Sequence, residues 1–460
     1  MDSKETPRPT HERSLPRRVL NWLEVDRAVF YAITSRGWQF VAGPITMILI
    51  AKYFSREVQG YYYTFWGMIG LQIFFELGFS QAVINIASHE WAKLTLNADR
   101  SIGGDAFALS RLAALFRYAC FYFGVMAIVF WLVVSIAGLL FFAVDRDSEA
   151  ISWRAPWLVL TALTAISFWL TPFLAVLEGC NQVKNVYKLQ LVRAVLGNVV
   201  VWGCILIGGA LWTPVVATIV RLLCEIYFAG VLYLRFFRDI SKKPIGTPLD
   251  WWVEVWPFQW RIGVKGLFGY FNAYIMNPVV FYYFGSVAAG QLGMTWQVLS
   301  SLQAACASWF QARVARMGML VAQKDFRELD RVFNRVARIA VGVMLVACLA
   351  FWLLDVLLHS IETPFSGRLL SPLPTALLAI GILSSLITHA QWTYIHAHQR
   401  SPFLLLTISG AIVSGLLIWW WGAWYGVLGV AVGYFAINIF FNLPVWTLVW
   451  RRCRNDWHAT

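Results

Sequence analysis

Twelve long apolar segments constrain the fold of this chain more than any other feature of its sequence. A helix rises about 1.5 Å per residue, so about 20 mostly apolar residues are needed to cross the ~30 Å hydrocarbon core of a bilayer. Segments of this kind lie near residues 29–51, 60–86, 118–143, 155–177, 189–209, 213–234, 256–282, 286–310, 336–358, 373–394, 402–421 and 425–449. Because they are much longer than the alternating strands of an outer-membrane barrel, they predict an all-α polytopic membrane protein.

The composition excludes other classes of protein. Hydrophobic residues make up 59% of the 460 residues and charged residues 13%, whereas soluble domains have about 45–50% and about 25%. An aromatic content of 16% excludes a disordered chain. The seven cysteines include no C-x-x-C pair, so we expect neither a disulfide framework nor a zinc site.

The distribution of positive charge predicts the orientation in the membrane. Loops on one side of the twelve segments, together with both termini, hold 27 of the 37 Lys and Arg residues, and loops on the other side hold 5. Positive residues are retained in the cytoplasm, so both termini are predicted to be cytoplasmic. The net charge of +13 then reflects membrane topology, and we expect no nucleic-acid partner.

A weak internal repeat predicts two lobes of six helices around a central cavity. Shifting the sequence by 230 residues aligns Tyr53–Trp66 with Tyr283–Trp296, and Tyr, Phe, Gly and Trp coincide at four positions. An even number of spans per repeat preserves orientation, and parallel repeats in transporters enclose a substrate path between them. The predicted parts are a cytoplasmic leader (1–28), an N-terminal lobe (29–235), a linker (236–255), a C-terminal lobe (256–450) and a cytoplasmic tail (451–460). The leader fits either an interfacial amphipathic helix or an ordered approach to the first span.

Cations inside the apolar segments are the candidate substrate-binding residues. A charge in the hydrocarbon costs roughly 2.5–3.5 kcal/mol, so such residues face a cavity, pair with another charge or extend to the headgroups. Arg36 and Lys265 lie at similar depths in spans that the repeat makes equivalent, and we expect each lobe to offer one cation to the cavity. Arg261 lies one turn nearer the surface; it is a further cavity candidate, but its side chain is expected rather to extend to the headgroups, and the same is expected of Arg193 at the start of its span.

Two intramembrane carboxylates are candidates for the cavity or for ion coupling. Glu76 approaches the depth of Arg36, which predicts a buried Arg–carboxylate pair; the alternative is a carboxylate linked to proton or sodium transport. Arg221 and Glu225 are four residues apart, so they share a helix face and are expected to neutralise each other. That face is also a candidate lining of the substrate path.

Motifs for catalysis, cofactors and metals are absent from the sequence. No phosphate-binding glycine loop, dinucleotide fingerprint or nucleophile elbow occurs, so we expect no enzyme activity and no cofactor. His389, His396 and His398 cluster in sequence, but no carboxylate or Cys accompanies them, and we expect no metal there.

The first two predicted spans resemble those of polysaccharide-lipid flippases of the multidrug/oligosaccharidyl-lipid/polysaccharide exporter superfamily. The resemblance rests on an Arg early in the first span, a Ser-x-x-x-x-Gly-Tyr turn and a Glu-Leu-Gly-Phe run, which here are Arg36, Ser55 to Tyr61 and Glu76 to Phe79. It implies that the chain moves an undecaprenyl-diphosphate-linked oligosaccharide across a bacterial inner membrane, for O-antigen, lipopolysaccharide or exopolysaccharide synthesis. It also implies membrane lipids and polysaccharide polymerase and ligase proteins as partners, and places Arg36 and Lys265 against the diphosphate.

Two other functions remain open at this point. A cation-coupled drug exporter of the same superfamily favours acidic residues in the cavity, whereas the intramembrane charges here are mostly basic. A membrane glycan polymerase or ligase needs a sizeable external loop, and the stretch 359–372, with His359 and Arg368, is the only one of that kind.

Overall fold

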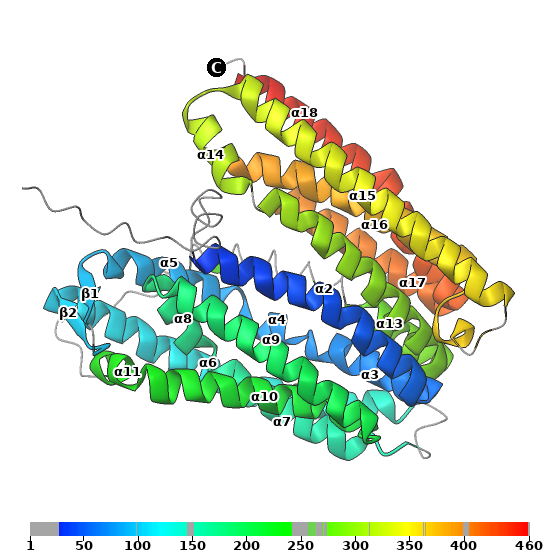
Figure 1. Ribbon diagram of the computed structural model, residues 1–460, viewed down its shortest axis with the longest axis horizontal. Helices are drawn as coiled ribbons and strands as arrows, with labels where there is room; N and C mark the ends of the chain where they lie inside the picture. The colour runs from blue at the N-terminus through cyan, green and yellow to red at the C-terminus, as the bar shows by residue number, and fades with distance from the viewer. Residues whose placement is uncertain are drawn as a thin grey trace, which may run out of the picture.

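Helices arranged in two lobes form the protein in the computed structural model (Figure 1). The structure describes residues 27–97, 99–144, 151–241, 256, 259–260, 263, 270, 274–311, 313–361, 363, 365–398 and 404–458. The first lobe contains α2 (Arg27–Tyr53), α3 (Arg56–Ile69), α4 (Gln72–Glu76), α5 (Phe79–Trp91), α6 (Ala106–Phe142), α7 (Arg154–Trp169), α8 (Thr171–Gly179), α9 (Val183–Leu206), η2 (Ala210–Trp212), α10 (Thr213–Tyr227), η3 (Phe228–Leu232) and α11 (Leu234–Ile240). The second contains α13 (Met276–Gln311), α14 (Val314–Ala322), α15 (Phe326–Ser360), η5 (Ser366–Arg368), α16 (Pro372–Ala397), α17 (Leu404–Ala436), η6 (Ile437–Asn442) and α18 (Leu443–His458).

Two of these helices reverse direction at a glycine, so each contributes parts of two spans. Gly285 in α13 has φ 83° and Gly426 in α17 has φ 60°, values that favour glycine. A Cβ at Gly293 would lie 2.7 Å from Asn277 Nδ2, although 16 residues of straight helix would separate the two positions by about 24 Å. The reversal at Gly285 falls in the predicted loop between residues 282 and 286, and the reversal at Gly426 falls just after the predicted loop between 421 and 425.

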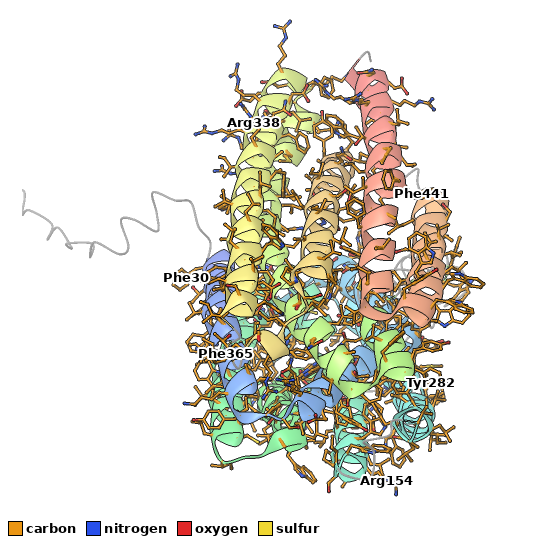
Figure 2. All side chains as sticks on the ribbon, turned by 90° about the vertical axis from the view of Figure 1, so that its right-hand side faces the viewer. Phe30, Arg154, Tyr282, Arg338, Phe365 and Phe441 are labelled. Atoms are coloured by element: carbon orange, nitrogen blue, oxygen red, sulfur yellow. The ribbon has the colours of Figure 1, made fainter. Side chains whose placement is uncertain are left out.

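Helix length and composition confirm a polytopic membrane protein. Seven helices in the described residues are long and apolar enough to span a bilayer, or eight if the bent pair Arg56–Glu76 and Phe79–Trp91 is one span. Their outer faces are apolar: on α15, Val346, Leu349 and Leu353 are 67%, 50% and 59% exposed. Figure 2 shows nitrogen-tipped side chains gathered near Arg338, at the far end of this lobe from Phe365. An apolar exterior of this extent is suited to lipid.

Several spans extend beyond their apolar segments. Helix α6 begins at Ala106 and α15 at Phe326, whereas the apolar runs predicted starts at 118 and 336. Aspartates cap both helices: Asp105 accepts a hydrogen bond from the Phe107 N–H, and Asp325 accepts one from the Glu328 N–H. The predicted loop 88–117 also contains a short antiparallel hairpin of β1 (Leu94–Leu96) and β2 (Ile102–Gly104). The apolar runs therefore located the spans but underestimated their length.

The two lobes meet where α3 packs against the second half of α13. A Cβ at Gly60 would overlap the Ser286 carbonyl oxygen, and one at Gly290 would lie 2.9 Å from the Gly60 nitrogen. Such direct backbone contact needs small residues on both helices. Tyr61 and Phe281 stack edge to face beside it, with ring centroids 5.0 Å apart. We call this region, with the adjoining loop 363–371, the closed end; from it the two lobes diverge toward α14 and the C-terminus (Figure 1).

Candidate functional site

A buried carboxylate in the first lobe holds two arginines. Glu225 on α10 is 2% exposed, and its Oε1 lies 2.9 Å from Arg221 Nε and 2.9 Å from Arg193 Nη1 on α9. Ser167 on α7 donates a hydrogen bond of 2.8 Å to Glu225 Oε2. The predicted pair of Arg221 and Glu225 is thus confirmed. The expectation that Arg193 extends to the headgroups is wrong, because Glu225 offers it a partner at mid-span.

This cluster carries a net positive charge within the membrane. Two guanidinium groups face one carboxylate, and the Arg193 and Arg221 side chains remain 28% and 46% exposed. The residues that face lipid on α10 are different: Leu223 is 61% exposed and Tyr227 57%. At 100° per residue these two lie more than 100° around the helix from Arg221. Arg221 therefore presents its positive charge away from the apolar outer face of α10.

Arg36 is exposed on a stripe of α2 that also carries the exposed Phe40. It shares a stripe with Phe40, Gly43 and Met47, at spacings of 4, 7 and 11 residues. Met47 packs against a cluster that joins Tyr63 of α3 to Met294 of α13. The strongly exposed apolar residues Val41 and Ile48 lie on another stripe of α2. Arg36 is thus on the stripe of α2 that reaches the contact between the two lobes.

Glu76 does not pair with Arg36, so the predicted ion pair is wrong. Both residues are described, and no ion pair joins them. Glu76 is the last residue of α4, where Leu77 and Gly78 adopt left-handed conformations and the span bends by 48°. The carbonyl of the preceding residue accepts a hydrogen bond from the Tyr122 hydroxyl on α6. The break therefore turns this segment toward α6. The depth of Glu76 estimated for a straight helix does not include this turn.

The cations predicted for the second lobe, Arg261 and Lys265, lie outside the described residues. Gly263, between them in sequence, is described: a Cβ there would lie 2.7 Å from the Leu77 carbonyl oxygen. The chain at this point therefore passes against the helix break that follows Glu76. Whether the two cations face the space between the lobes stays a prediction.

A hydrogen-bonded latch fastens the closed end. Gln59 on α3 is 1% exposed, and its Nε2 donates to the Gly290 carbonyl at 2.8 Å and to the Arg368 carbonyl at 3.1 Å. Arg368, in the loop between α15 and α16, donates in return to Gln59 Oε1 and to the Phe54 carbonyl. Each lobe thus contributes donors and acceptors, and no buried polar atom of Gln59 is left without a partner.

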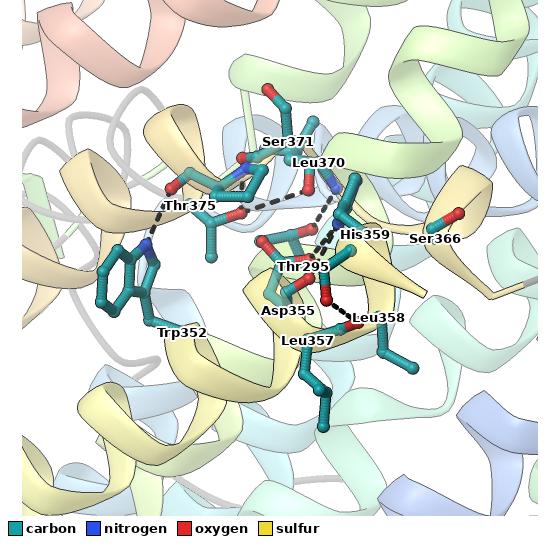
Figure 3. Close-up of polar contacts among 12 residues, drawn as sticks. Thr295, Trp352, Asp355, Leu357, Leu358, His359, Ser366, Leu370, Ser371 and Thr375 are labelled. Carbon is teal, nitrogen blue, oxygen red and sulfur yellow. Dashed lines mark hydrogen bonds and ion pairs between the residues drawn. The ribbon is translucent and has the colours of Figure 1, made fainter. Parts of the chain in front are cut away.

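One ionisable pair in the second lobe was missed in the sequence. Asp355 on α15 is fully buried, and its Oδ1 lies 3.3 Å from His359 Nδ1 (Figure 3). The i, i+4 spacing of an acid and a histidine was the available signal. The predicted apolar segment ends at 358, between Asp355 and His359, so the pattern of apolar segments does not show the pair. His359 lines a cavity of about 490 Å³ at the closed end, together with Gln291, Ser366 and Tyr425.

The histidines at the other end of α16 form no metal site in the described part of the chain. No group of three or more His, Cys, Asp or Glu residues comes close enough to hold an ion there. His398 packs against Trp457 with ring centroids 4.6 Å apart and the rings tilted by 38°, and His389 lines a 230 Å³ cavity with Trp392 and Asn442.

Comparison with known proteins identifies the fold. No family model matches the sequence, and no curated protein matches it. Among solved structures, lipid II flippase MurJ in an inward closed conformation aligns with a TM-score of 0.65 and 14% identity, over 92% of this chain and 87% of that chain. The inward-facing conformation of a multidrug resistance MATE family transporter of the MOP superfamily gives 0.61 and 12%, over 90% and 99%. An outward-facing conformation of a MATE family transporter gives 0.55 and 13%, over 96% and 99%. The chain therefore has the two-lobed, all-helical fold of the MATE transporters and the MurJ flippase.

Proposed function

We propose that this chain is a flippase for an anionic lipid-linked glycan. By the resemblance of its first two spans, the substrate is an undecaprenyl-diphosphate-linked oligosaccharide, carried from the cytoplasmic to the periplasmic leaflet of a bacterial inner membrane for surface polysaccharide synthesis. The lobes alternate access to a cavity between them, and the polymerase and ligase that use the product are the expected partners. The MurJ neighbour, a lipid II flippase, shares the fold and supports this class of substrate.

The observation that carries the proposal is the sign of the accessible charge at mid-span. Among the intramembrane charges named above in the described part of the first lobe, Arg36, Arg193 and Arg221 are exposed or partly exposed. Glu225 is 2% exposed and Glu76 is partly exposed, so the accessible arginines outnumber the accessible carboxylates three to one. A diphosphate cannot cross hydrocarbon without replacing its hydration. Guanidinium groups supply charge-assisted hydrogen bonds for this purpose, in a geometry that matches phosphate oxygens.

We assign the closed end to the periplasmic side. The distribution of Lys and Arg supports this orientation, because α14 and the C-terminal end of α18 then lie in the cytoplasm. The higher similarity to the inward-facing than to the outward-facing MATE conformation agrees with it. In this assignment the Gln59–Arg368 latch is the periplasmic gate, and the substrate enters from the cytoplasmic leaflet.

A multidrug exporter is the second candidate, and the MATE neighbours support its fold equally well. The charges argue against cationic drugs, because three of the four accessible groups named above are positive. Drug susceptibility separates the two functions: a deletion strain that becomes sensitive to cationic drugs while keeping its surface glycan supports the exporter.

A glycan polymerase or ligase is disfavoured by the positions of its two candidate residues. Arg368 is bound in the latch, and His359 lies against the buried Asp355.

The proposal predicts that cavity cations are needed for export. We expect Arg36→Ala and Lys265→Ala each to lower surface glycan about tenfold or more, since a hydrogen bond to a charged group contributes about 1.5–3 kcal/mol and 1.4 kcal/mol is tenfold in affinity. Glycan staining of complemented deletion cells, normalised to the amount of protein in the membrane, measures the effect. Arg235→Ala is the matched control, because this side chain is 68% exposed and outside the apolar segments. Export at the wild-type level in both variants would show that these cations do not bind the substrate.

A further inference from the structure

We propose that Asp355 and His359 form a proton-binding site that controls the latch at the closed end. The inference rests on the proposed alternating-access function for its role in transport, but the site itself is argued from the geometry of the second lobe.

The carboxylate of Asp355 is buried, and no donor in the described residues meets it in good hydrogen-bonding geometry. The residue is 0% exposed, and neither of its carboxylate oxygens has a hydrogen-bond partner. The nearby hydroxyl of Thr375 donates to the Ser371 carbonyl at 3.0 Å instead (Figure 3). An ionised carboxylate in these surroundings is costly unless a proton or a cation compensates it.

His359 is the group that compensates Asp355. Its Nδ1 lies 2.9 Å from the Asp355 backbone carbonyl and 3.3 Å from the carboxylate Oδ1. A carbonyl oxygen only accepts hydrogen bonds, so Nδ1 carries a hydrogen. Adding a proton to Nε2 then gives an imidazolium beside the carboxylate, and adding it to Asp355 gives a neutral acid. In either form the pair holds one exchangeable proton and is electrically neutral.

The cavity at the closed end gives this proton a route to water. His359 lines the 490 Å³ cavity, whereas Asp355 lies one helical turn deeper along α15. The cavity has an otherwise uncharged lining, with Tyr425 as its other ionisable residue. In the described part of the chain, Arg368 of the adjoining loop is the nearest further charged group of the second lobe in sequence, and Arg56 and Glu57 of α3 lie near it. Helices α13 and α16 contribute Thr295 and Thr375, which are uncharged.

One loop connects the pair to the latch. Arg368 of this loop binds Gln59 and Phe54 of the first lobe. Two residues later, the Leu370 N–H donates to Thr295 beside Asp355. Opening the closed end moves this loop and admits water to the carboxylate, which removes the cost of ionisation. The closed state therefore binds the proton more tightly than the open state, and by linkage the proton stabilises the latch.

Opening of the closed end is expected to depend on pH. Because the closed state holds one proton more than the open state, lowering the pH favours closure and raising it favours opening, by up to tenfold in the equilibrium constant per pH unit. A proton taken up from the periplasm thus closes the periplasmic gate.

Distance measurements by electron paramagnetic resonance test the proposal in the purified, full-length protein. Nitroxide labels at Tyr53→Cys and Leu373→Cys, two exposed positions on different lobes at the closed end, report opening. The half-buried Cys120, Cys224 and Cys453 are replaced by serine to avoid background labelling. We expect a short distance at pH 5.5 and an added longer component at pH 8.5.

Variants distinguish this site from other titrating groups. We expect Asp355→Asn, which mimics the protonated acid, to keep the short distance at both pH values. We expect His359→Gln to move the transition to lower pH, since Asp355 alone must then bind the proton. Asp99→Asn, at an exposed carboxylate on the β1–β2 turn, should leave the wild-type response intact.

A pH response that persists in Asp355→Asn would overturn the proposal, as would a response of the wild type to sodium at constant pH in place of protons. No glycan is present in this experiment. A negative result in this experiment therefore does not argue against the flippase function. Conversely, evidence against the flippase function would not change the pH response expected here.

Discussion

The Gly60→Val variant is expected to lose export because the closed end cannot close. A side chain at this position overlaps the Ser286 carbonyl oxygen, which belongs to the backbone of α13 and cannot rotate away. Overpacking of a tight contact costs typically 1–3 kcal/mol, which shifts the balance between closed and open states about 5- to 150-fold. The first lobe itself does not need this contact, so the variant should insert normally.

Thiol labelling measures this effect directly. In the wild type, a cysteine at Ser286, which is 1% exposed, should react only slowly with a membrane-impermeant maleimide added to the periplasmic side, because it is accessible only while the closed end is open. In Gly60→Val it should react. Gly43→Ala is the matched control, because a Cβ at Gly43 meets nothing within 4 Å. Normal export by Gly60→Val, with Ser286→Cys still protected, would show that α3 and α13 tolerate separation without consequence.

The neutral triple variant Arg193→Gln, Arg221→Gln, Glu225→Gln is expected to fold but not to export. Removing only the arginines leaves Glu225 buried without its partners, and breaking a buried pair costs about 3–5 kcal/mol. Removing all three charges avoids that cost, since amides of similar size can hydrogen-bond to one another. The variant therefore separates the contribution of the positive charge from the contribution of the cluster to stability.

We expect surface glycan to fall at least about tenfold in this variant, by loss of up to two charge-assisted hydrogen bonds of about 1.5–3 kcal/mol each. The thermal stability of the purified protein and the amount in the membrane serve as measurements of folding. Arg193→Lys with Arg221→Lys is the control that keeps the net charge and should retain part of the export. Full export by the neutral triple variant would place the substrate elsewhere.

Spacing in the sequence was sufficient to predict contacts between residues of one helix, whereas contacts between helices depend on how the helices pack. The i, i+4 spacing of Arg221 and Glu225 was sufficient to predict their pair. Arg193 joins it from another helix, 32 residues away from Glu225, and no local pattern contains that contact. Similarly, interruptions in hydropathy located the reversals at Gly285 and Gly426, because a turn in a membrane protein interrupts the apolar run.

The predictions failed where a helix departs from ideal geometry or where apolar content alone was used to locate a span. The pair of Arg36 and Glu76 was expected from equal depth in two straight helices, but Leu77 and Gly78 break the second one. Asp355 was overlooked inside an otherwise apolar segment. The Gln59–Arg368 latch joins residues 309 apart in sequence, and only the arrangement of the two lobes brings them together.

The central claim is that this chain carries an anionic lipid-linked glycan between leaflets, and the leaflet distribution of that lipid in spheroplasts tests it most directly. A membrane-impermeant oxidant of sugars, applied to intact spheroplasts, reports the fraction in the outer leaflet. Without the chain, we expect the glycan lipid to accumulate protected in the inner leaflet, and re-expression should make it accessible within minutes. Equal accessibility with and without the chain would contradict the account.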